Sequence, residues 1–269
     1  MAARPLSLHQ LTALDASPAE LVAIASTLGC EHVCLFTHVP ERARHIYPAV
    51  TNETRQAVAD GLERSGVSLF NLEVFPLTTD VALDEFRAGL ELGASLGARR
   101  ATAHIHIEDA AQATETFAGF CDLAAEYGIG AGIEFNAFSK VRSLAAAAGL
   151  IAAVARHNAD IVLDCLHAVR SGAEPEEIAA HADQIGYAQI CDGPREVARD
   201  ARWAEAIEER MIPGDGDFPL AAMLRHLHPS TVIEVEVPQA RAAAEGVRSL
   251  ERARRAVEGA RRFTGASAS

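Results

Sequence analysis

The chain has 269 residues, 49% of them hydrophobic, and a formal net charge of −13 at pH 7. This is enough apolar sequence for one large core, and the acidic balance argues against a protein whose main partner is the phosphate backbone of a nucleic acid. Five scattered cysteines without a CxxC pair argue against a disulfide framework or a structural zinc site.

Short β-like runs alternate with amphipathic segments along the whole chain, in eight pairs. The expected strands are 6–14, 32–39, 68–76, 100–107, 129–135, 161–163 extended by a few residues, 187–191 and 231–237. The expected helices are a first one capped by Ser17 and Glu20, then 52–65, 83–96, 109–128, 143–157, 175–182, 219–227 and 241–263.

This alternation predicts an α/β fold, a single (β/α)₈ TIM barrel that spans residues 1–269 as one domain. The main competitor is a doubly wound sheet. That fold calls for a glycine-rich phosphate-binding turn after its first strand, but residues 11–15 contain no glycine. The barrel is therefore favoured.

Polar residues gather at the ends of two apolar runs between residues 159 and 194. Asp164 and His167 follow the first run, Gln189 and Asp192 end the second, and one short helix opened by Pro175 is expected between them. Because α/β sheets keep their chemistry at the carboxyl ends of strands, this stretch is typical of an active site.

Four oxygen donors occupy corresponding places on four successive expected strands: Glu134 in IEFN, Asp164 in VLDC, Gln189 in AQIC and Glu236 in EVEV. Three carboxylates in one apolar mouth without a cation would cost several kcal/mol in repulsion and desolvation. Oxygen-rich sets suit Mg²⁺ or Mn²⁺, with Zn²⁺ or Co²⁺ as alternatives. The sequence therefore predicts one divalent metal ion.

These motifs, with Asp164-Cys165-Leu166-His167, the run 189–192 and RMIPGDGDFP at 210–219, resemble the xylose isomerase-like TIM barrels. That family includes sugar epimerases, hydroxypyruvate isomerases and dehydroshikimate dehydratases. The resemblance begins near the fourth strand and implies the same four metal ligands. Gln189 stands where many sugar epimerases have His. A Gln at this position is more similar to the hydroxypyruvate isomerases and dehydroshikimate dehydratases. Lys140 stands where some ketose epimerases place a substrate-binding Glu.

Four further residues are expected to bind substrate: His167, Arg210, His104 and Lys140. His167 matches a position that contacts substrate oxygens in family members, and Arg210 could clamp a carboxylate or polarise a hydroxyl. His104 and His106 alternate on one strand, so both can face the barrel. Lys140 is either an electrophile or base, or an exposed loop lysine.

The chemistry that fits is proton abstraction next to a carbonyl, with the metal ion as Lewis acid and Glu134 and Glu236 as general base and acid. Glu234 and Glu236 should both face inward, with Glu236 nearer the mouth. We therefore expect an isomerase or epimerase that works through an enediolate. The alternatives are a dehydratase (a lyase) of the 3-dehydroshikimate type, an AP-endonuclease-like nuclease, and a barrel that only binds a ligand.

The expected partner is a small carbohydrate or keto-acid, with no nucleic acid, and a homo-oligomer stays open. The amino-terminal residues lack the apolar core of a signal peptide, and no apolar run reaches the length of a membrane span. The sequence therefore predicts a cytoplasmic protein without a membrane partner.

Overall fold

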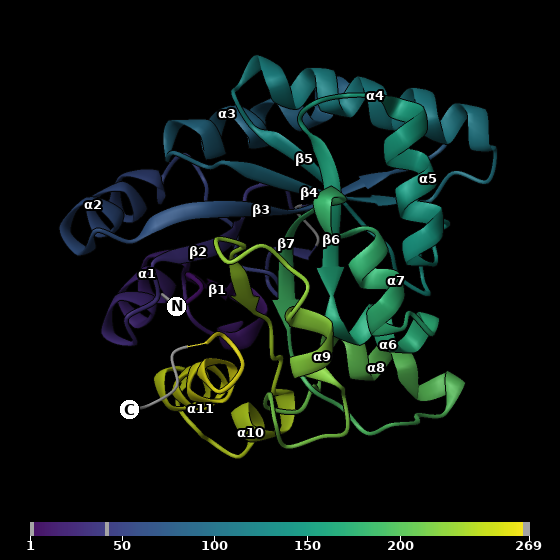
Figure 1. Ribbon diagram of the computed structural model, residues 1–269. Helices are drawn as coiled ribbons and strands as arrows, with labels where there is room; N and C mark the ends of the chain where they lie inside the picture. The colour runs from purple at the N-terminus through teal and green to yellow at the C-terminus, as the bar shows by residue number, and fades with distance from the viewer. Residues whose placement is uncertain (1–2, 41–42, 266–269) are drawn as a thin grey trace.

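Eight parallel strands close into a barrel in chain order, with β1 next to β8 (Figure 1). The computed structural model describes residues 3–40 and 43–265. The strands are β1 (Leu6–His9), β2 (His32–Phe36), β3 (Ser68–Leu77), β4 (Arg100–Ile105), β5 (Gly130–Glu134), β6 (Ala159–Asp164), β7 (Ile185–Ile190) and β8 (Ile233–Val235). The predicted (β/α)₈ TIM barrel is confirmed.

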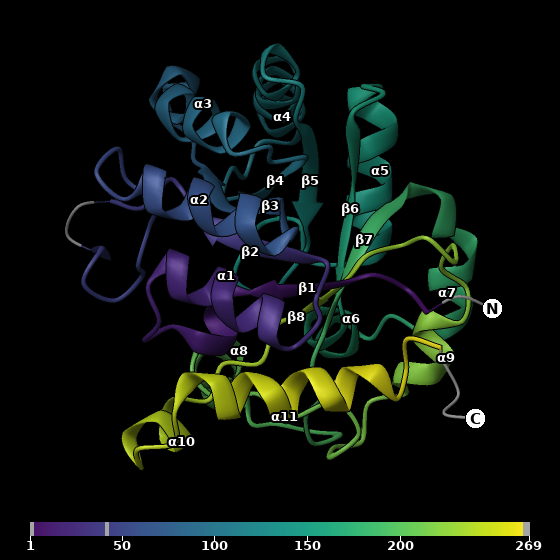
Figure 2. The same cartoon turned by 90° about the vertical axis from the view of Figure 1, so that its left-hand side faces the viewer.

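Helices cover the outside of the strands, as Figure 2 shows from a second direction. They are α1 (Pro18–Thr27), α2 (Arg55–Ser65), α3 (Arg87–Ser95), α4 (Ala110–Glu126), α5 (Leu144–Val154), α6 (Cys165–Ser171), α7 (Pro175–Ala180), α8 (Arg202–Ile207), α9 (Leu220–Leu224), α10 (Ala240–Ala244) and α11 (Ser249–Arg261). The predicted capping box starts α1, since Ser17 and Glu20 bond each other's backbone N–H. Within the described residues, no helix is both long and apolar enough to cross a membrane.

The ends of several elements differ from the sequence prediction. The first strand stops at His9 because its ring Nδ1 accepts a hydrogen bond from the Leu11 N–H, which caps a short 3₁₀ turn over Gln10–Ala13. The predicted helix 241–263 is two helices, α10 and α11, with Gly246 in the left-handed region (φ 83°) between them. The helices α6 and α8 were not predicted.

The packing divides the residues of each strand between two environments. Side chains that face outward join one continuous apolar core beneath the helices. Inside the barrel, a separate small cluster of Phe70, Val162, Tyr187 and Val232 is apolar apart from the Tyr187 hydroxyl. The rest of the interior is polar, with buried residues such as Ser7, Asn71 and Thr102. The chemistry of the protein is therefore concentrated inside the barrel.

Candidate functional site

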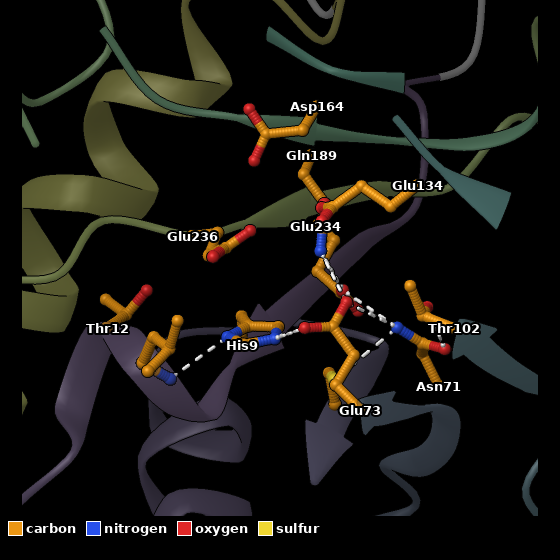
Figure 3. A network of polar contacts seen from close by, with 12 residues as sticks. His9, Thr12, Asn71, Glu73, Thr102, Glu134, Asp164, Gln189, Glu234 and Glu236 are labelled. Carbon is orange, nitrogen blue, oxygen red and sulfur yellow. Dashed lines mark hydrogen bonds and ion pairs between the residues drawn. The ribbon is translucent and has the colours of Figure 1, made fainter. Parts of the chain in front are cut away.

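The four predicted oxygen donors come together at the carboxyl end of the barrel. Glu134 and Asp164 are the last residues of β5 and β6, Gln189 is the penultimate residue of β7, and Glu236 directly follows β8. All four are at most 5% exposed. Figure 3 shows them around a common space, each from a different strand.

Asp164 and His167 are linked by local helix geometry. Asp164 is the N-cap of α6, and its Oδ1 accepts a hydrogen bond of 3.1 Å from the His167 N–H. The Asp-x-x-His spacing therefore places His167 in the first turn of α6, close to the end of β6. Ligand atoms of Glu134, Asp164 and His167 all lie within 4.8 Å of one another. Burial lowers the pKa of His167, and its Nε2 lies 4.0 Å from Glu134 Oε2.

Arg210 bridges two of the predicted ligands. Its guanidinium contacts Asp164 Oδ2 at 2.7 Å and Glu236 Oε1 at 3.1 Å, and its Nε donates to the carbonyl of Ala206 at 2.9 Å. Burial alone would raise the pKa of Asp164, but the Arg210 charge holds it at about 2. The Arg210 guanidinium is thus bonded to groups of the protein itself, and its predicted contact with substrate stays a prediction.

Two buried oxygens at this site, Gln189 Oε1 and Glu236 Oε2, have no hydrogen-bond partner among the described residues. The Gln189 amide is oriented by its Nε2, which donates to Glu73 at 2.7 Å and Glu234 at 3.2 Å. Burial raises the pKa of Glu236 well above its usual range despite the nearby Arg210. Unpaired buried acceptors are rare and costly, and a cation would satisfy both.

The charge of the site also fits a divalent cation. Glu134, Asp164 and Glu236 carry three negative charges when ionised, and Arg210 carries one positive charge. With the three carboxylates ionised, their negative charge exceeds the positive charge of Arg210 even when His104 is also protonated, and a divalent cation would compensate the excess. Carboxylate and amide oxygens are ligands that these hard or borderline ions accept. The residues present fit the predicted metal ion.

Glu134 is held by two neighbours. His104, from β4, forms a hydrogen bond with its Oε2, and Asn136 Nδ2 donates to the same oxygen at 3.4 Å. Although burial opposes protonation, the adjacent carboxylate raises the pKa of His104. Asn136 was not singled out from the sequence. His104 and Asn136 together fix the direction in which Glu134 faces.

A second polar layer lies below the metal-binding candidates. Ser7 Oγ donates to Glu234 at 2.8 Å, and Asn71 Nδ2 donates to the Tyr187 hydroxyl at 2.7 Å and to Glu73 at 3.1 Å. Sequence reasoning did not assign this layer. Its signal is polar residues two apart on otherwise apolar strands, as in Ser7/His9, Asn71/Glu73, Thr102/His104 and Glu234/Glu236.

One part of this lower layer contains potential metal ligands: His9, Cys34, Glu73 and Glu234. The Leu11 N–H donates to His9 Nδ1 at 3.0 Å, so the ring proton lies on Nε2 and is donated to Glu73 at 2.7 Å. The ring has no lone pair left for a cation. This group is therefore a satisfied hydrogen-bond network.

A cavity of about 340 Å³ opens above the site. Its polar lining includes several predicted residues, namely Glu134, Glu236, His104, His106, His167 and Arg210. Lys140 does not line this cavity. Its ammonium pairs with Glu108 beside a different hollow, near Ala146 and Leu150. This geometry does not support the predicted contact between Lys140 and the substrate.

A closed parallel barrel with oxygen donors at the ends of β5 to β8 defines the protein as a TIM barrel with a candidate metal site at its catalytic end. The sequence profile of the family described as Xylose isomerase-like TIM barrel matches residues 22–257. The chain belongs to this family.

Solved structures share the fold at low sequence identity. A xylose isomerase domain protein from Alicyclobacillus acidocaldarius has a TM-score of 0.75 and 22% identity, with 97% of this chain and 98% of that chain covered. The IOLI protein, solved with a binding zinc atom, has a TM-score of 0.79 and 18% identity over 97% and 98%. D-allulose 3-epimerase from Methylomonas sp. has a TM-score of 0.71 and 15% identity, with 97% of this chain and 99% of that chain covered. No curated protein sequence matches this chain.

Proposed function

We propose that this protein is a divalent-metal-dependent isomerase or epimerase of a small hydroxy-carbonyl compound, acting through an enediolate. The observation that carries the proposal is the pair of unpaired buried oxygens, Gln189 Oε1 and Glu236 Oε2, beside Glu134 and Asp164. The family and the epimerases among the structural neighbours support the reaction class. The zinc atom of the IOLI structure supports the metal.

Glu134, Asp164, Gln189 and Glu236 would hold the ion, with His167 beside them. When bound, a divalent cation supplies Lewis acidity that favours negative charge on the oxygens of a hydroxy-carbonyl substrate. The ion is Mn²⁺ or Mg²⁺, with Zn²⁺ or Co²⁺ as alternatives, since the set offers oxygen and imidazole ligands.

Glu134 and Glu236 are the proton carriers. Glu134 ends β5 and Glu236 directly follows β8, on different sides of the site, so a substrate between them meets a carboxylate on each side. His104 holds the orientation of Glu134 through their hydrogen bond. His104 and His167 line the cavity and would bind substrate oxygens, whereas Arg210, which also lines it, would hold Asp164 and Glu236 in position. Lys140 has no part in this proposal, since it pairs with Glu108 away from the cavity.

The fate of the proton decides the reaction. Its return to the neighbouring carbon isomerises the substrate, and its return to the opposite face epimerises it. Loss of a β-hydroxyl group after proton abstraction would dehydrate the substrate instead. These outcomes share one first step, the exchange of a carbon-bound proton next to the carbonyl.

Proton NMR in D₂O tests the proposal directly. Metal-loaded protein is incubated with ketoses and hydroxy-keto acids, and the signal of the proton next to the carbonyl is followed. We expect this signal to disappear for at least one compound, together with the formation of an isomer. An unsaturated product would assign a dehydratase instead. A protein that holds its metal ion but exchanges no carbon-bound proton in the panel would contradict the proposal.

A further inference from the structure

The cavity above the site has two chemically different ends. Its inner end holds Glu134, His104, Arg210 and Glu236, the polar groups described above. Its outer part is mainly apolar, with Leu11, Val39, Pro40, Val74, Pro76 and Ile207 in its lining, although His38 and His106 also line the cavity. A molecule that fills the cavity therefore meets polar partners at one end and hydrocarbon at the other.

Aromatic side chains line this outer part on two sides. On one side the Phe138 ring packs edge-to-face on Trp203, with 4.9 Å between the ring centroids. The Phe138 ring also lies edge-to-face to the site residue His167, with 6.4 Å between the centroids. On another side the Tyr47 ring packs edge-to-face on Phe36 at 5.8 Å. Phe36 ends β2 and Phe138 follows β5, three strands apart around the barrel. The two aromatic pairs can therefore contact one ligand from different sides.

The rim of the cavity leaves large apolar side chains in solvent. Trp203 is 54% exposed and Ile46, next to Tyr47, is 49% exposed. Within residues 3–40 and 43–265, the only other large apolar side chain of this kind is Met211, next to Arg210. Of these three residues, Trp203 lines the cavity, and Ile46 and Met211 each adjoin in sequence a residue that lines it. Such a placement is typical of a surface that a ligand covers.

A fully hydroxylated sugar does not fit these walls well. Each hydroxyl buried against hydrocarbon without a partner loses its hydrogen bonds to water. Several polar side chains at the inner end are also already used. Arg210 is bonded to Asp164, Glu236 and a backbone carbonyl, and Asn136 Oδ1 accepts from the N–H groups of Phe138 and Ser139.

We propose that the substrate carries an aryl or branched alkyl group on its hydroxy-carbonyl unit, and that this group lies between the Phe138–Trp203 and Phe36–Tyr47 pairs. This inference rests on the proposed function, because the metal site would hold the hydroxy-carbonyl end. It narrows the substrate class from polyhydroxy sugars to compounds with an apolar substituent.

Two hydroxamic acids test the inference, because a hydroxamate chelates metal through two adjacent oxygens as an enediolate would. Acetohydroxamate and phenylacetohydroxamate differ in one phenyl group. Their binding to the Zn²⁺-loaded protein is measured by calorimetry and by fluorescence. Trp203 is the single tryptophan of the chain, so its emission reports directly on the cavity rim.

We expect phenylacetohydroxamate to bind about 10- to 100-fold more tightly than acetohydroxamate, since burial of the phenyl group is favourable. It should also shift the Trp203 emission to shorter wavelength. Phe138→Ala should remove most of this preference while affinity for acetohydroxamate stays the same. Phe263→Ala, which shortens an aromatic side chain outside the cavity lining, should keep it.

The outcomes separate the two proposals. Equal affinity for the two hydroxamates would overturn the apolar substituent and leave the proposed function standing. A preference that survives in Phe138→Ala would overturn the assignment of the aromatic wall. If neither hydroxamate binds the zinc-loaded protein, the proposed function itself fails, and the inference fails with it.

Discussion

Two layers inside the barrel contain the same kinds of side chains but use them differently. In the lower layer, Ser7 and Asn71 both donate hydrogen bonds to Glu234, and Glu73 bonds His9. In the upper layer, oxygens of Gln189 and Glu236 have no partner within the described chain. Burial and polarity are common to both layers. Unpaired acceptors that lie beside other carboxylates at the strand ends, and not buried polar residues as such, therefore distinguish the upper layer as the place for a ligand.

Strand β8 shows this contrast between two residues of the same type. Glu234 and Glu236 stand two residues apart, and both are buried. Glu234 accepts hydrogen bonds from Ser7, Asn71 and Gln189. Glu236 contacts Arg210 through one oxygen and keeps the other unpaired. The two glutamates therefore form a matched pair for experiment.

Glu236→Gln should have the largest effect, because it removes a proton carrier. We expect the rate of solvent deuterium exchange to fall roughly 10²–10⁴-fold, the usual cost of losing a general base. Glu234→Gln keeps the shape of the side chain and one acceptor oxygen, replaces the other oxygen by an amide nitrogen, and should change this rate far less. Exchange rates for both variants are measured by NMR with one substrate at matched metal content. If Glu234→Gln abolished exchange while Glu236→Gln kept it, the roles of the two layers would be reversed.

Arg210→Met should strongly destabilise the metal-free protein. Asp164 and Glu236 would lose the charge that compensates them, and an uncompensated buried pair typically costs about 3–5 kcal/mol. Thermal unfolding with EDTA and with Mn²⁺ measures this loss. We expect the cation to restore part of the Tm, because it takes over the compensation.

A surface variant provides the control for Arg210. Arg87 pairs with Glu126 in solvent, and Arg87→Met should change the Tm little with or without metal. Equal Tm values for Arg210→Met and the wild-type protein in EDTA would show that the upper layer does not depend on this bridge.

Gln189 belongs to both layers, and its replacement should disturb each of them moderately. In Gln189→Leu, Glu73 and Glu234 lose a donor, and we expect the free energy of unfolding to fall by about 1–3 kcal/mol. Metal affinity should fall as well, because one ligand oxygen is gone. Gln189→His keeps a ring nitrogen for the ion and should bind metal more tightly than Gln189→Leu. The opposite order would exclude residue 189 as a ligand.

The barrel could be predicted from the sequence because apolar strand-like runs and helical segments recur in a regular order along the chain. Eight apolar runs alternate with helical segments, and each strand overlaps the predicted range. The ends of strands could not be predicted equally well. β1 stops at His9 because a side chain caps the following turn, and β8 is only three residues long. α6 was missed because Asp164 and His167 were interpreted only as a metal ligand and a substrate-binding residue, while the same spacing also caps a helix.

The candidate site was predictable where it lies at strand ends and not where loops build it. Glu134, Asp164, Gln189 and Glu236 are each fixed by a strand, so their convergence follows from barrel geometry. Trp203 and Phe138 come from separate segments after different strands. Their contact depends on tertiary packing that has no sequence period. Lys140 shows the same difficulty, since Glu108 holds it away from the cavity.

Titration of the metal-free protein with Mn²⁺ tests the metal site most directly. Calorimetry should give one ion per chain for the wild-type protein and for Glu234→Gln. It should give greatly reduced binding for Asp164→Asn, which stays folded by circular dichroism. Unchanged stoichiometry and affinity in Asp164→Asn, or the loss of binding in Glu234→Gln alone, would contradict the assignment of the ion to the upper layer.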